Sequence, residues 1–286
     1  NQTNKIMSIR KFLFITFLFK FIIVCQGKTN LNEKRPNLIF FFPDTLRAES
    51  FNSYGNTVPN LTPNFQAFGK EGTRFEQAHV MHTQCSPSRC TMMTGRYMHT
   101  LGHRTQIHLI RAYEENYFRL LKESGYHVSW YGKNDALSQA AFNLSVSEWE
   151  NDIGYDSGKN AYEFGESGYW SMLSTGGSKS SNDPTNGDLK AVLKAIEFLN
   201  SNPPEPFVIF LPTRGGHPPY GAPKDFKNKW TIDEIKKHVK LRPSGIKGKP
   251  KYHSNADGIR HYRNLTYLNE DTMYEIQKSY LEMISY

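Results

Sequence analysis

Two short runs of consecutive apolar residues constrain the fold of this 286-residue chain most strongly. Leu38 to Phe42 and Phe207 to Leu211 are apolar at every position, which is the pattern of strands buried on both faces of a sheet. Between them, Glu115 to Ser124 has the spacing of an amphipathic helix that Gly125 ends, and Tyr126 to Tyr131 follows as a strand. This alternation predicts a three-layer α/β/α domain with a largely parallel central sheet.

The remaining segments extend the same alternation. Thr73 to Val80 is expected to be a further strand, and the polar stretch from Asn143 to Gly187 is expected to be irregular or partly helical. The sequence predicts the remaining helices over residues 63–72, 189–199 and 272–286. The first of them is expected to pack Phe65 and Phe68 inward.

One cysteine lies at the expected start of a short helix. Ser86 is a competent N-cap, Pro87 has the fixed φ of a first helical position, and Gly95 has the place of a C-terminal glycine. Cys85 should therefore lie at the positive end of the helix, with Arg89 one turn further on. An anionic group is favoured at such a position.

Three other polar residues each follow a predicted strand, namely Asp44, Lys133 and His217. Taken singly, they are more typical of a turn residue, a solvated lysine and a loop histidine. Ligands of open α/β sheets, however, lie outside the carboxyl ends of the strands. Because Cys85 follows the expected strand at residues 73–80, one site can collect all four side chains.

These motifs, in this order, resemble those of the type I sulfatases, which belong to the alkaline-phosphatase-like superfamily. The resemblance runs from about Arg35 to the end of the chain. It is carried by the Cys-x-Pro-Ser-Arg motif at Cys85 and by residues 35–44, 61–65, 71–75, 125–133 and 206–218.

The resemblance implies a set of roles. Cys85 would be oxidised to formylglycine by a formylglycine-generating enzyme, and its hydrate would be the nucleophile. Asp44 and the modified Cys85 would bind one divalent metal, most often Ca²⁺ in this family. Arg89 would hold the oxygen of the nucleophile, and Lys133 would bridge it to the sulfate. His217 would contact the sulfate or protonate the leaving alkoxide.

His82 and His103 are further candidates for the substrate pocket. Two positions depart from the family pattern. Thr45 stands where a second aspartate is common, and Asp135 stands where a histidine is usual. Neither can replace the charge that it displaces, so one metal ligand and one proton donor are in question.

The function expected from the resemblance is hydrolysis of sulfate esters, with sulfated carbohydrates as the substrate class. Three alternatives remain open. The first is a phosphonate or phosphodiester hydrolase of the same superfamily. The second is a catalytically inactive, sulfatase-like protein that binds glycans, which the departures at Thr45 and Asp135 motivate. The third is a protease-type cysteine nucleophile at Cys85, which the helix position favours.

The N-terminal residues 1–27 have the layout of a secretory signal peptide, with Met7 as the expected start. Their apolar run is too short to span a bilayer, so no transmembrane segment is expected in the mature chain. Removal of residues 1–27 takes away four basic residues and no acid, which lowers the net charge from +8 to +4. An extracellular or lysosomal protein is expected, with glycosylation sequons at Asn143 and Asn264.

The mature part would be a catalytic domain over residues 28–286. It retains only Cys85 and Cys90, so no disulfide framework is expected. The lysine-rich stretch from Lys224 to Lys251 has no accompanying nucleic-acid-binding motif, and nucleic acid is not expected as a partner. The last helix stops without a cap or a polar tail. We expect the domain to be truncated there, and this piece alone to bind metal poorly and to lack activity.

Overall fold

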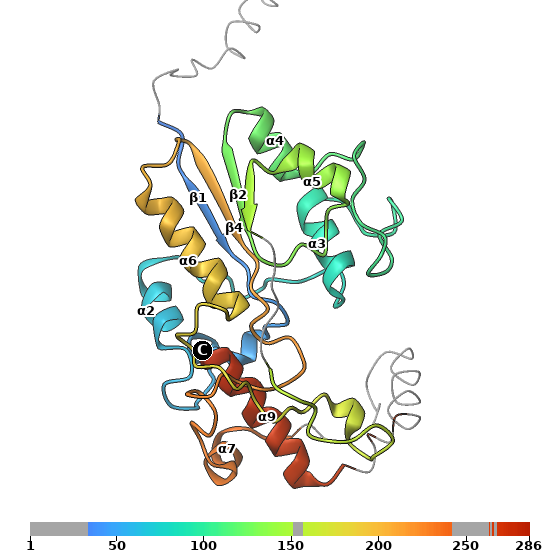
Figure 1. The fold of residues 1–286 in the computed structure, drawn as a ribbon, viewed down its shortest axis with the longest axis vertical. Coiled ribbons are helices and arrows are strands. Elements are labelled where there is room, and N and C mark those ends of the chain that lie inside the picture. Colours follow the sequence, from blue (N-terminus) through green and yellow to red (C-terminus); the bar gives the residue numbers. More distant parts are fainter. Residues whose placement is uncertain (1–33, 151–156, 242–262, 264, 266–267) are drawn as a thin grey trace, which may run out of the picture. The chain divides into compact units, whose positions relative to one another are not determined.

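The computed structural model describes residues 34–150, 157–241, 263, 265 and 268–286. The signal peptide expected at residues 1–27, its start at Met7 and the sequon at Asn264 lie outside this part of the chain. Within it, four strands form one sheet in the order β1-β4-β2-β3, and every neighbouring pair is parallel (Figure 1). The strands are Leu38–Phe41 (β1), His127–Tyr131 (β2), Glu148–Glu150 (β3) and Phe207–Leu211 (β4).

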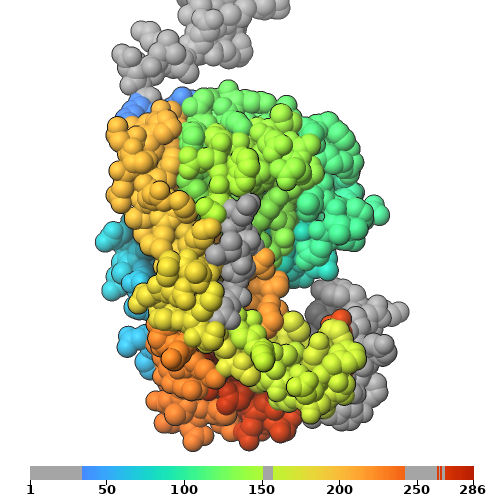
Figure 2. Space-filling view, in the orientation of Figure 1, coloured from blue at the N-terminus to red at the C-terminus, as the bar shows by residue number. Residues whose placement is uncertain are grey.

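Helices cover both faces of this sheet. α3 (Cys85–Thr94), α4 (Tyr117–Glu123) and α5 (Gln139–Ser145) lie over one face, and α6 (Gly187–Asn200) lies over the other (Figure 1). In Figure 2 the green atoms of the α4 and α5 region and the amber atoms of the α6 region lie on opposite sides of the upper part of the molecule. The three-layer α/β/α architecture with a parallel central sheet is confirmed.

Strand alternation explains how each face is filled. In β4, Val208 and Phe210 point into the cluster with α3, α4 and α5, which also holds Trp130 of β2. The alternate residues Ile209 and Leu211 pack on the other face, against apolar side chains of α6. Because successive side chains of a strand point to opposite faces, the continuous apolar run in β4 follows from its central position.

The first strand is less buried than its sequence predicts. β1 pairs with β4 on one side, and among the described residues no strand pairs with its other edge. Ile39 and Phe41 consequently remain 58% and 46% exposed. An apolar run predicts that a strand can be buried on both faces, but it does not say whether the covering elements are present.

Two further expectations for the neighbouring segment are wrong. Residues 73–80 form no strand and are exposed throughout. This segment mixes charged and polar residues with apolar ones. It pairs with no strand in the described chain, so its backbone takes part in no hydrogen-bonded ladder. The helix before it forms as Pro63–Glu71 (α2), but Phe68 is 75% exposed. Phe65 does pack, against Phe41 and Phe51.

Other elements follow the sequence more closely. α4, α6 and the last helix, Glu270–Ser285 (α9), lie where the apolar spacing predicts them. The polar stretch after Asn143 contains the end of α5, the short strand β3 and a 3₁₀ turn at Tyr169–Ser171 (η3). Two more 3₁₀ turns, Ala48–Ser50 (η1) and Asn52–Tyr54 (η2), follow β1. α9 and Ile232–His238 (α7) share a third apolar cluster.

None of the helices in the described ranges combines the length and the apolarity needed to cross a lipid bilayer.

Candidate active site

The carboxyl ends of three strands are joined by backbone hydrogen bonds, and this brings their following residues together. The N–H of Asp44, after β1, donates to the carbonyl of Thr213, after β4, at 2.9 Å. The N–H of Lys133, after β2, donates to the carbonyl of Pro212 at 2.9 Å. Parallel strands in register therefore deliver Asp44, Lys133 and the loop that leads to His217 to one edge of the sheet.

Gly132 allows β2 to deliver Lys133 at this edge. Its φ is +123°, a backbone conformation that residues with a side chain rarely adopt. A Cβ at this position would lie 2.5 Å from the carbonyl oxygen of Pro212. Only glycine fits here without a shift of the backbone that carries Lys133.

The loop that carries His217 is held by the first turn of α6. The carboxylate of Asp188 accepts hydrogen bonds from the backbone N–H groups of Arg214 and Gly215, at 2.7 and 2.9 Å. The N–H of His217 then closes a turn onto the carbonyl of Arg214 at 2.8 Å. Sequence reasoning missed Asp188, because an acidic residue in a first helical turn usually interacts only with its own helix.

Helix α3 begins two residues earlier than the sequence predicts. Gln84, not Ser86, is the N-cap, and Cys85 is the first helical residue. The side chain of Gln106 accepts from the Ser86 N–H at 3.0 Å, a donor that an N-cap side chain would otherwise take, and from the Ser86 hydroxyl at 2.7 Å. The end of the helix is as expected, with Gly95 at φ +66°.

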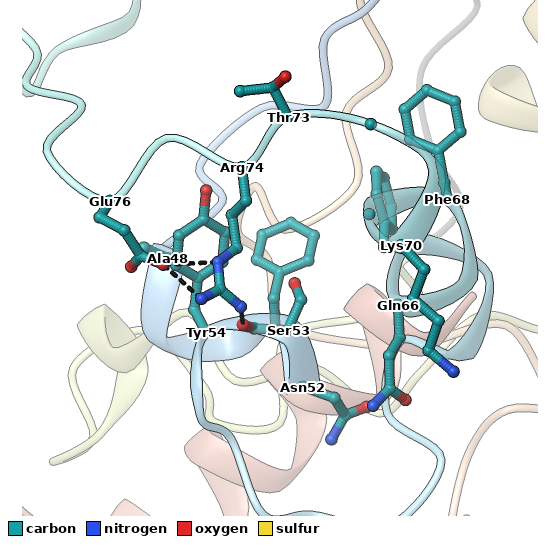
Figure 3. A pocket seen from close by; sticks show the side chains of 14 residues that line it. Ala48, Asn52, Ser53, Tyr54, Gln66, Phe68, Lys70, Thr73, Arg74 and Glu76 are labelled. Carbon is teal, nitrogen blue, oxygen red and sulfur yellow. Dashed lines mark hydrogen bonds and ion pairs between the residues drawn. The ribbon is translucent and has the colours of Figure 1, made fainter.

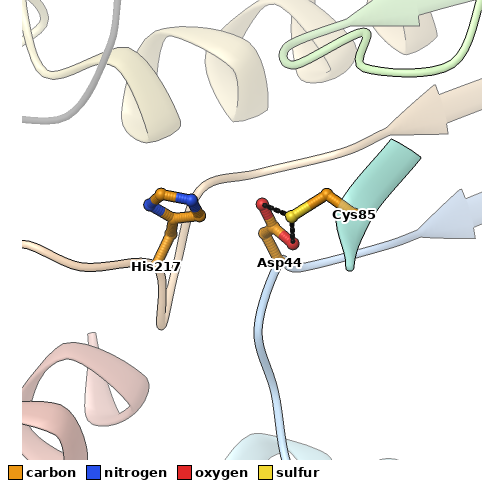
Figure 4. A group of neighbouring side chains, drawn as sticks. All are labelled: Asp44, Cys85 and His217. Atoms are coloured by element: carbon orange, nitrogen blue, oxygen red, sulfur yellow. Dashed lines mark hydrogen bonds between the residues drawn. The ribbon is translucent and has the colours of Figure 1, made fainter. Parts of the chain in front are cut away.

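Asp44 lies at the centre of the group. The thiol of Cys85 is 3.6 Å from each of its carboxylate oxygens, and Figure 4 shows the two side chains pointing toward each other. Lys133 Nζ donates to Asp44 Oδ2 and lies 3.8 Å from Cys85 Sγ. Arg89 Nη2 is 3.6 Å from Asp44 Oδ1. The structure therefore brings together the side chains that the sequence predicts at one site.

His217 completes the group from the loop after β4 (Figure 4). One ligand atom each from Asp44, Cys85 and His217 lie within 4.8 Å of one another. The ring Nδ1 of His217 is 2.6 Å from the carbonyl oxygen of Pro218, which leaves Nε2 for other partners.

Charge neighbours set the protonation of these groups. Burial alone would raise the pKa of the Asp44 carboxyl, but the hydrogen bond from Lys133 and the charge of Arg89 outweigh it and hold this pKa below its usual value. Burial and the charge of Asp44 raise the pKa of the Cys85 thiol. The thiol is thus held protonated, which is the opposite of what a protease-type cysteine nucleophile requires.

Arg89 carries unused hydrogen-bonding capacity in this site. Its guanidinium is buried over the ring of Phe42, and both terminal nitrogens lack a hydrogen-bond partner. A buried donor pair without an acceptor is costly unless a further group binds there. An anionic or oxygen-rich group beside Asp44 would satisfy it.

The donor set fits part of a metal shell. Ca²⁺ takes six to eight oxygen ligands, and Asp44 supplies a carboxylate, whereas the ring nitrogen of His217 nearby is not a ligand of that kind. Cys85 offers sulfur as a thiol and would offer oxygen if oxidised to the aldehyde hydrate. Among the described residues, no further histidine, cysteine or carboxylate joins this group of candidate metal-ligating residues. The set therefore suits a divalent cation that completes its shell from other oxygen donors.

The two departures from the family pattern have clear structural positions. Thr45 has φ +56°, and its N–H donates to Asp44 Oδ1 at 2.9 Å. It therefore contributes a backbone donor at the place of a second carboxylate. Asp135, also at positive φ, pairs with Lys133 at 2.9 Å. Burial alone would lower the pKa of Lys133, but its hydrogen bonds to Asp135 and Asp44 raise it.

Three other predicted residues lie outside this group. The His82 ring accepts from the N–H of Gln84 at 3.0 Å, at the start of α3. His103 is buried, with Nδ1 2.7 Å from the carbonyl oxygen of His108 and Nε2 3.5 Å from Glu114. Neither joins the metal-ligating group of the described chain. Asn143 is exposed on α5, so its side chain is accessible.

A separate hollow of about 810 Å³ lies beside α2 and η2 (Figure 3). Aromatic side chains line it, including Phe51 and Phe65. Of its charged residues, Arg74 is already paired with Glu76 and with the carbonyl of Ser53. None of the predicted site residues lines this hollow.

A family model described as Sulfatase matches residues 36–285. The chain therefore belongs to the sulfatase family. The N-acetylglucosamine-6-O-sulfatase of Bacteroides thetaiotaomicron is 27% identical over 115 residues, which are 40% of this chain and 20% of that protein. An uncharacterized sulfatase of Escherichia coli is 25% identical over 209 residues, or 69% of this chain and 41% of that protein.

Solved structures share the fold. The phosphonate monoester hydrolase of Agrobacterium radiobacter superposes with a TM-score of 0.61 at 14% identity, over 87% of this chain and 56% of that one. The alkaline-phosphatase-like architecture expected from the sequence is thereby confirmed. The matched part spans less than half of both curated relatives and a little over half of this solved structure.

Proposed function

We propose that the protein hydrolyses sulfate esters, with formylglycine made from Cys85 as the nucleophile. One observation carries the proposal, which is the convergence of Cys85, Asp44, Lys133 and His217 at the carboxyl edge of the sheet of a sulfatase-family chain. A chance arrangement would not place a lysine, a histidine, a carboxylate and a convertible cysteine around one point.

Each residue has a role that its position supports. Asp44 and the oxidised Cys85 would hold a divalent metal, with Ca²⁺ as the proposed ion, which supplies charge to neutralise sulfate oxygens. Arg89 would donate its unpartnered N–H groups to the oxygen of the modified Cys85. Lys133, which touches both Asp44 and Cys85, would hold the nucleophile and a sulfate oxygen together.

His217 would serve the leaving group. Its Nδ1 faces a backbone carbonyl, so the ring is oriented with Nε2 free to contact a sulfate oxygen or to give a proton to the departing alkoxide. Asp135 cannot take this part, because its carboxylate already pairs with Lys133.

We further propose sulfated carbohydrates as the substrate class, because a curated relative is named as an N-acetylglucosamine-6-O-sulfatase. The biosynthetic partner would be a formylglycine-generating enzyme, which acts on the cysteine of the Cys-x-Pro-Ser-Arg motif. Passage through the secretory pathway, with glycosylation at Asn143 and Asn264, would lead to an extracellular or lysosomal location.

Parallel assays of the full-length protein test this function. The protein, secreted from a eukaryotic host, is given an aryl sulfate, an aryl phosphate diester and sulfated glucosamine. We expect release of sulfate from the aryl sulfate and from the sugar. Turnover of the phosphate diester alone would instead support the phosphodiesterase alternative, and glycan binding without sulfate release would support the inactive binding protein.

A pair of cysteine variants links the activity to the site. Cys85→Ala should abolish sulfate release because no formylglycine can form. Cys90→Ala is the matched control on the same helix, since Cys90 is buried in the core with its thiol 3.6 Å from the carbonyl of Ala136. Sulfate release that survives Cys85→Ala would exclude the proposed nucleophile.

A further inference from the structure

Tyr280 connects α9 to the loop that carries Asp44. It is buried, and it lies 235 positions from Thr45 in the sequence. Its hydroxyl nevertheless donates to the carbonyl oxygen of Thr45 at 2.9 Å. The residue that follows the proposed metal ligand is thus held from a distant helix.

The Thr45 backbone needs such support. A β-branched residue at φ +56° is in a conformation that costs about 1–3 kcal/mol unless its surroundings stabilise it. The N–H of the same residue donates to Asp44 Oδ1 at 2.9 Å. A bond at the Thr45 carbonyl therefore helps to fix the orientation of the Asp44 carboxylate.

The ring of Tyr280 also packs against the loop that carries His217. A Cβ placed on Gly216, the residue before His217, would lie 2.9 Å from Tyr280 Cε2. The same point would lie 3.3 Å from the Thr45 carbonyl oxygen and 3.5 Å from that of Asp44. The ring and the two loops meet at a position where only glycine fits.

We propose that Tyr280 is a positioning residue of the active site, which orients Asp44 through Thr45 and supports His217 through Gly216. The inference rests on the proposed function for its catalytic consequence. Without the hydroxyl, the Thr45 carbonyl loses the bond that holds it. The peptide between Asp44 and Thr45, whose N–H bonds Asp44 Oδ1, can then shift and release the carboxylate from its orientation.

Tyr280→Phe tests the proposal, because it removes the hydroxyl and keeps the ring. The matched control is Tyr274→Phe, since Tyr274 is buried on α9 in the same apolar cluster as Tyr280, with the ammonium of Lys236 5.2 Å from its ring centroid. Hydrogen exchange of a peptide covering residues 43–50, followed by mass spectrometry on the full-length protein, reports the backbone around Thr45 without any need for activity. Steady-state kinetics with an aryl sulfate report the catalytic effect.

We expect faster exchange at residues 43–50 in Tyr280→Phe, and a loss of about tenfold in kcat with KM close to that of the wild type. Tyr274→Phe should change neither. Unchanged exchange at residues 43–50 in Tyr280→Phe overturns the positioning role, even if kcat falls. Faster exchange with an unchanged kcat overturns its catalytic consequence.

The two proposals can fail separately. If the wild-type protein hydrolyses no sulfate ester while Tyr280→Phe still exchanges faster at residues 43–50, the proposed function is wrong and the positioning of the loop stands. Gly216→Ala probes the same contact from the opposite side, and it should speed exchange in that peptide as well.

Discussion

Lys133 and Asp44 form a buried ion pair across the ends of β2 and β1, with exposed fractions of 5% and 6%. The pair joins two strands that are not neighbours in the sheet, since β4 lies between them. It also sets the charge beside Cys85, because Lys133 Nζ is 3.8 Å from Cys85 Sγ. The same contact therefore links the carboxyl ends of two strands and places a cation beside the proposed nucleophile.

Replacement of this lysine should damage both stability and turnover. Lys133→Ala leaves the Asp44 carboxylate buried without its hydrogen-bonded cation, so we expect a loss of about 3 kcal/mol in the free energy of unfolding. We also expect kcat with an aryl sulfate to fall about 100-fold. Urea denaturation and steady-state kinetics measure the two effects.

Lys190→Ala is the control for that variant. Lys190 pairs with Glu150 at 2.6 Å in a half-buried position away from Asp44. Its removal should cost less than about 1 kcal/mol and leave kcat unchanged. Equal losses in the two variants would show that Lys133 is an ordinary structural lysine.

Gly132 should tolerate no side chain. In Gly132→Ala the new Cβ would lie 2.5 Å from the Pro212 carbonyl oxygen at a positive φ, so we expect a loss of about 2 kcal/mol or more. Gly69→Ala, inside α2 with no atom near the new Cβ, should instead stabilise the protein by about 0.5–1 kcal/mol. Thermal melting distinguishes the two, and a neutral Gly132→Ala would contradict the packing described at the end of β2.

Glu282 should make stability depend on pH. Its side chain is 2% exposed on α9, and burial raises its pKa from 4.5 to about 7, although Lys278 and the backbone N–H of Lys229 act in the opposite direction. Folding thus favours the protonated form. The resulting stability is fully present below pH 4.5 and is lost as the pH rises through about 7, by about 3 kcal/mol in all.

The comparison with Glu282→Gln isolates this effect from other titrations. The free energy of unfolding of the wild type, measured relative to that of the variant, should fall between pH 4.5 and pH 7 and stay level above that range. A constant difference from pH 4 to pH 8 would show that Glu282 keeps an ordinary pKa in the folded protein.

Much of the fold could be predicted from the sequence, because β4 and α6 have local patterns that match their surroundings. β4 is apolar throughout and central, and α6 carries an apolar stripe on one face. Residues 73–80 were predicted wrongly because their pattern suits a strand only when a partner strand is present. The exposed Phe41 has the same cause, since sequence patterns do not show which neighbours an edge strand has.

The residues of the site could be predicted from the sequence, but the residues that hold them in position could not. Asp44 and Lys133 each follow a strand that the sequence predicts, so the topology of a parallel sheet was enough to place them together. Asp188 and Tyr280 act from helices distant in sequence, through contacts that no local pattern indicates. The position of His103 was equally hidden, because burial beside Glu114 depends on the path of a whole loop.

The central claim is that the nucleophile comes from Cys85, and peptide mapping by mass spectrometry tests it most directly. The full-length protein is secreted from a eukaryotic host that converts another sulfatase in the same cells, and both cysteines of α3 are analysed. The account predicts an aldehyde at Cys85 and an unmodified thiol at Cys90. A quantitatively unmodified thiol at Cys85 in that host would contradict it.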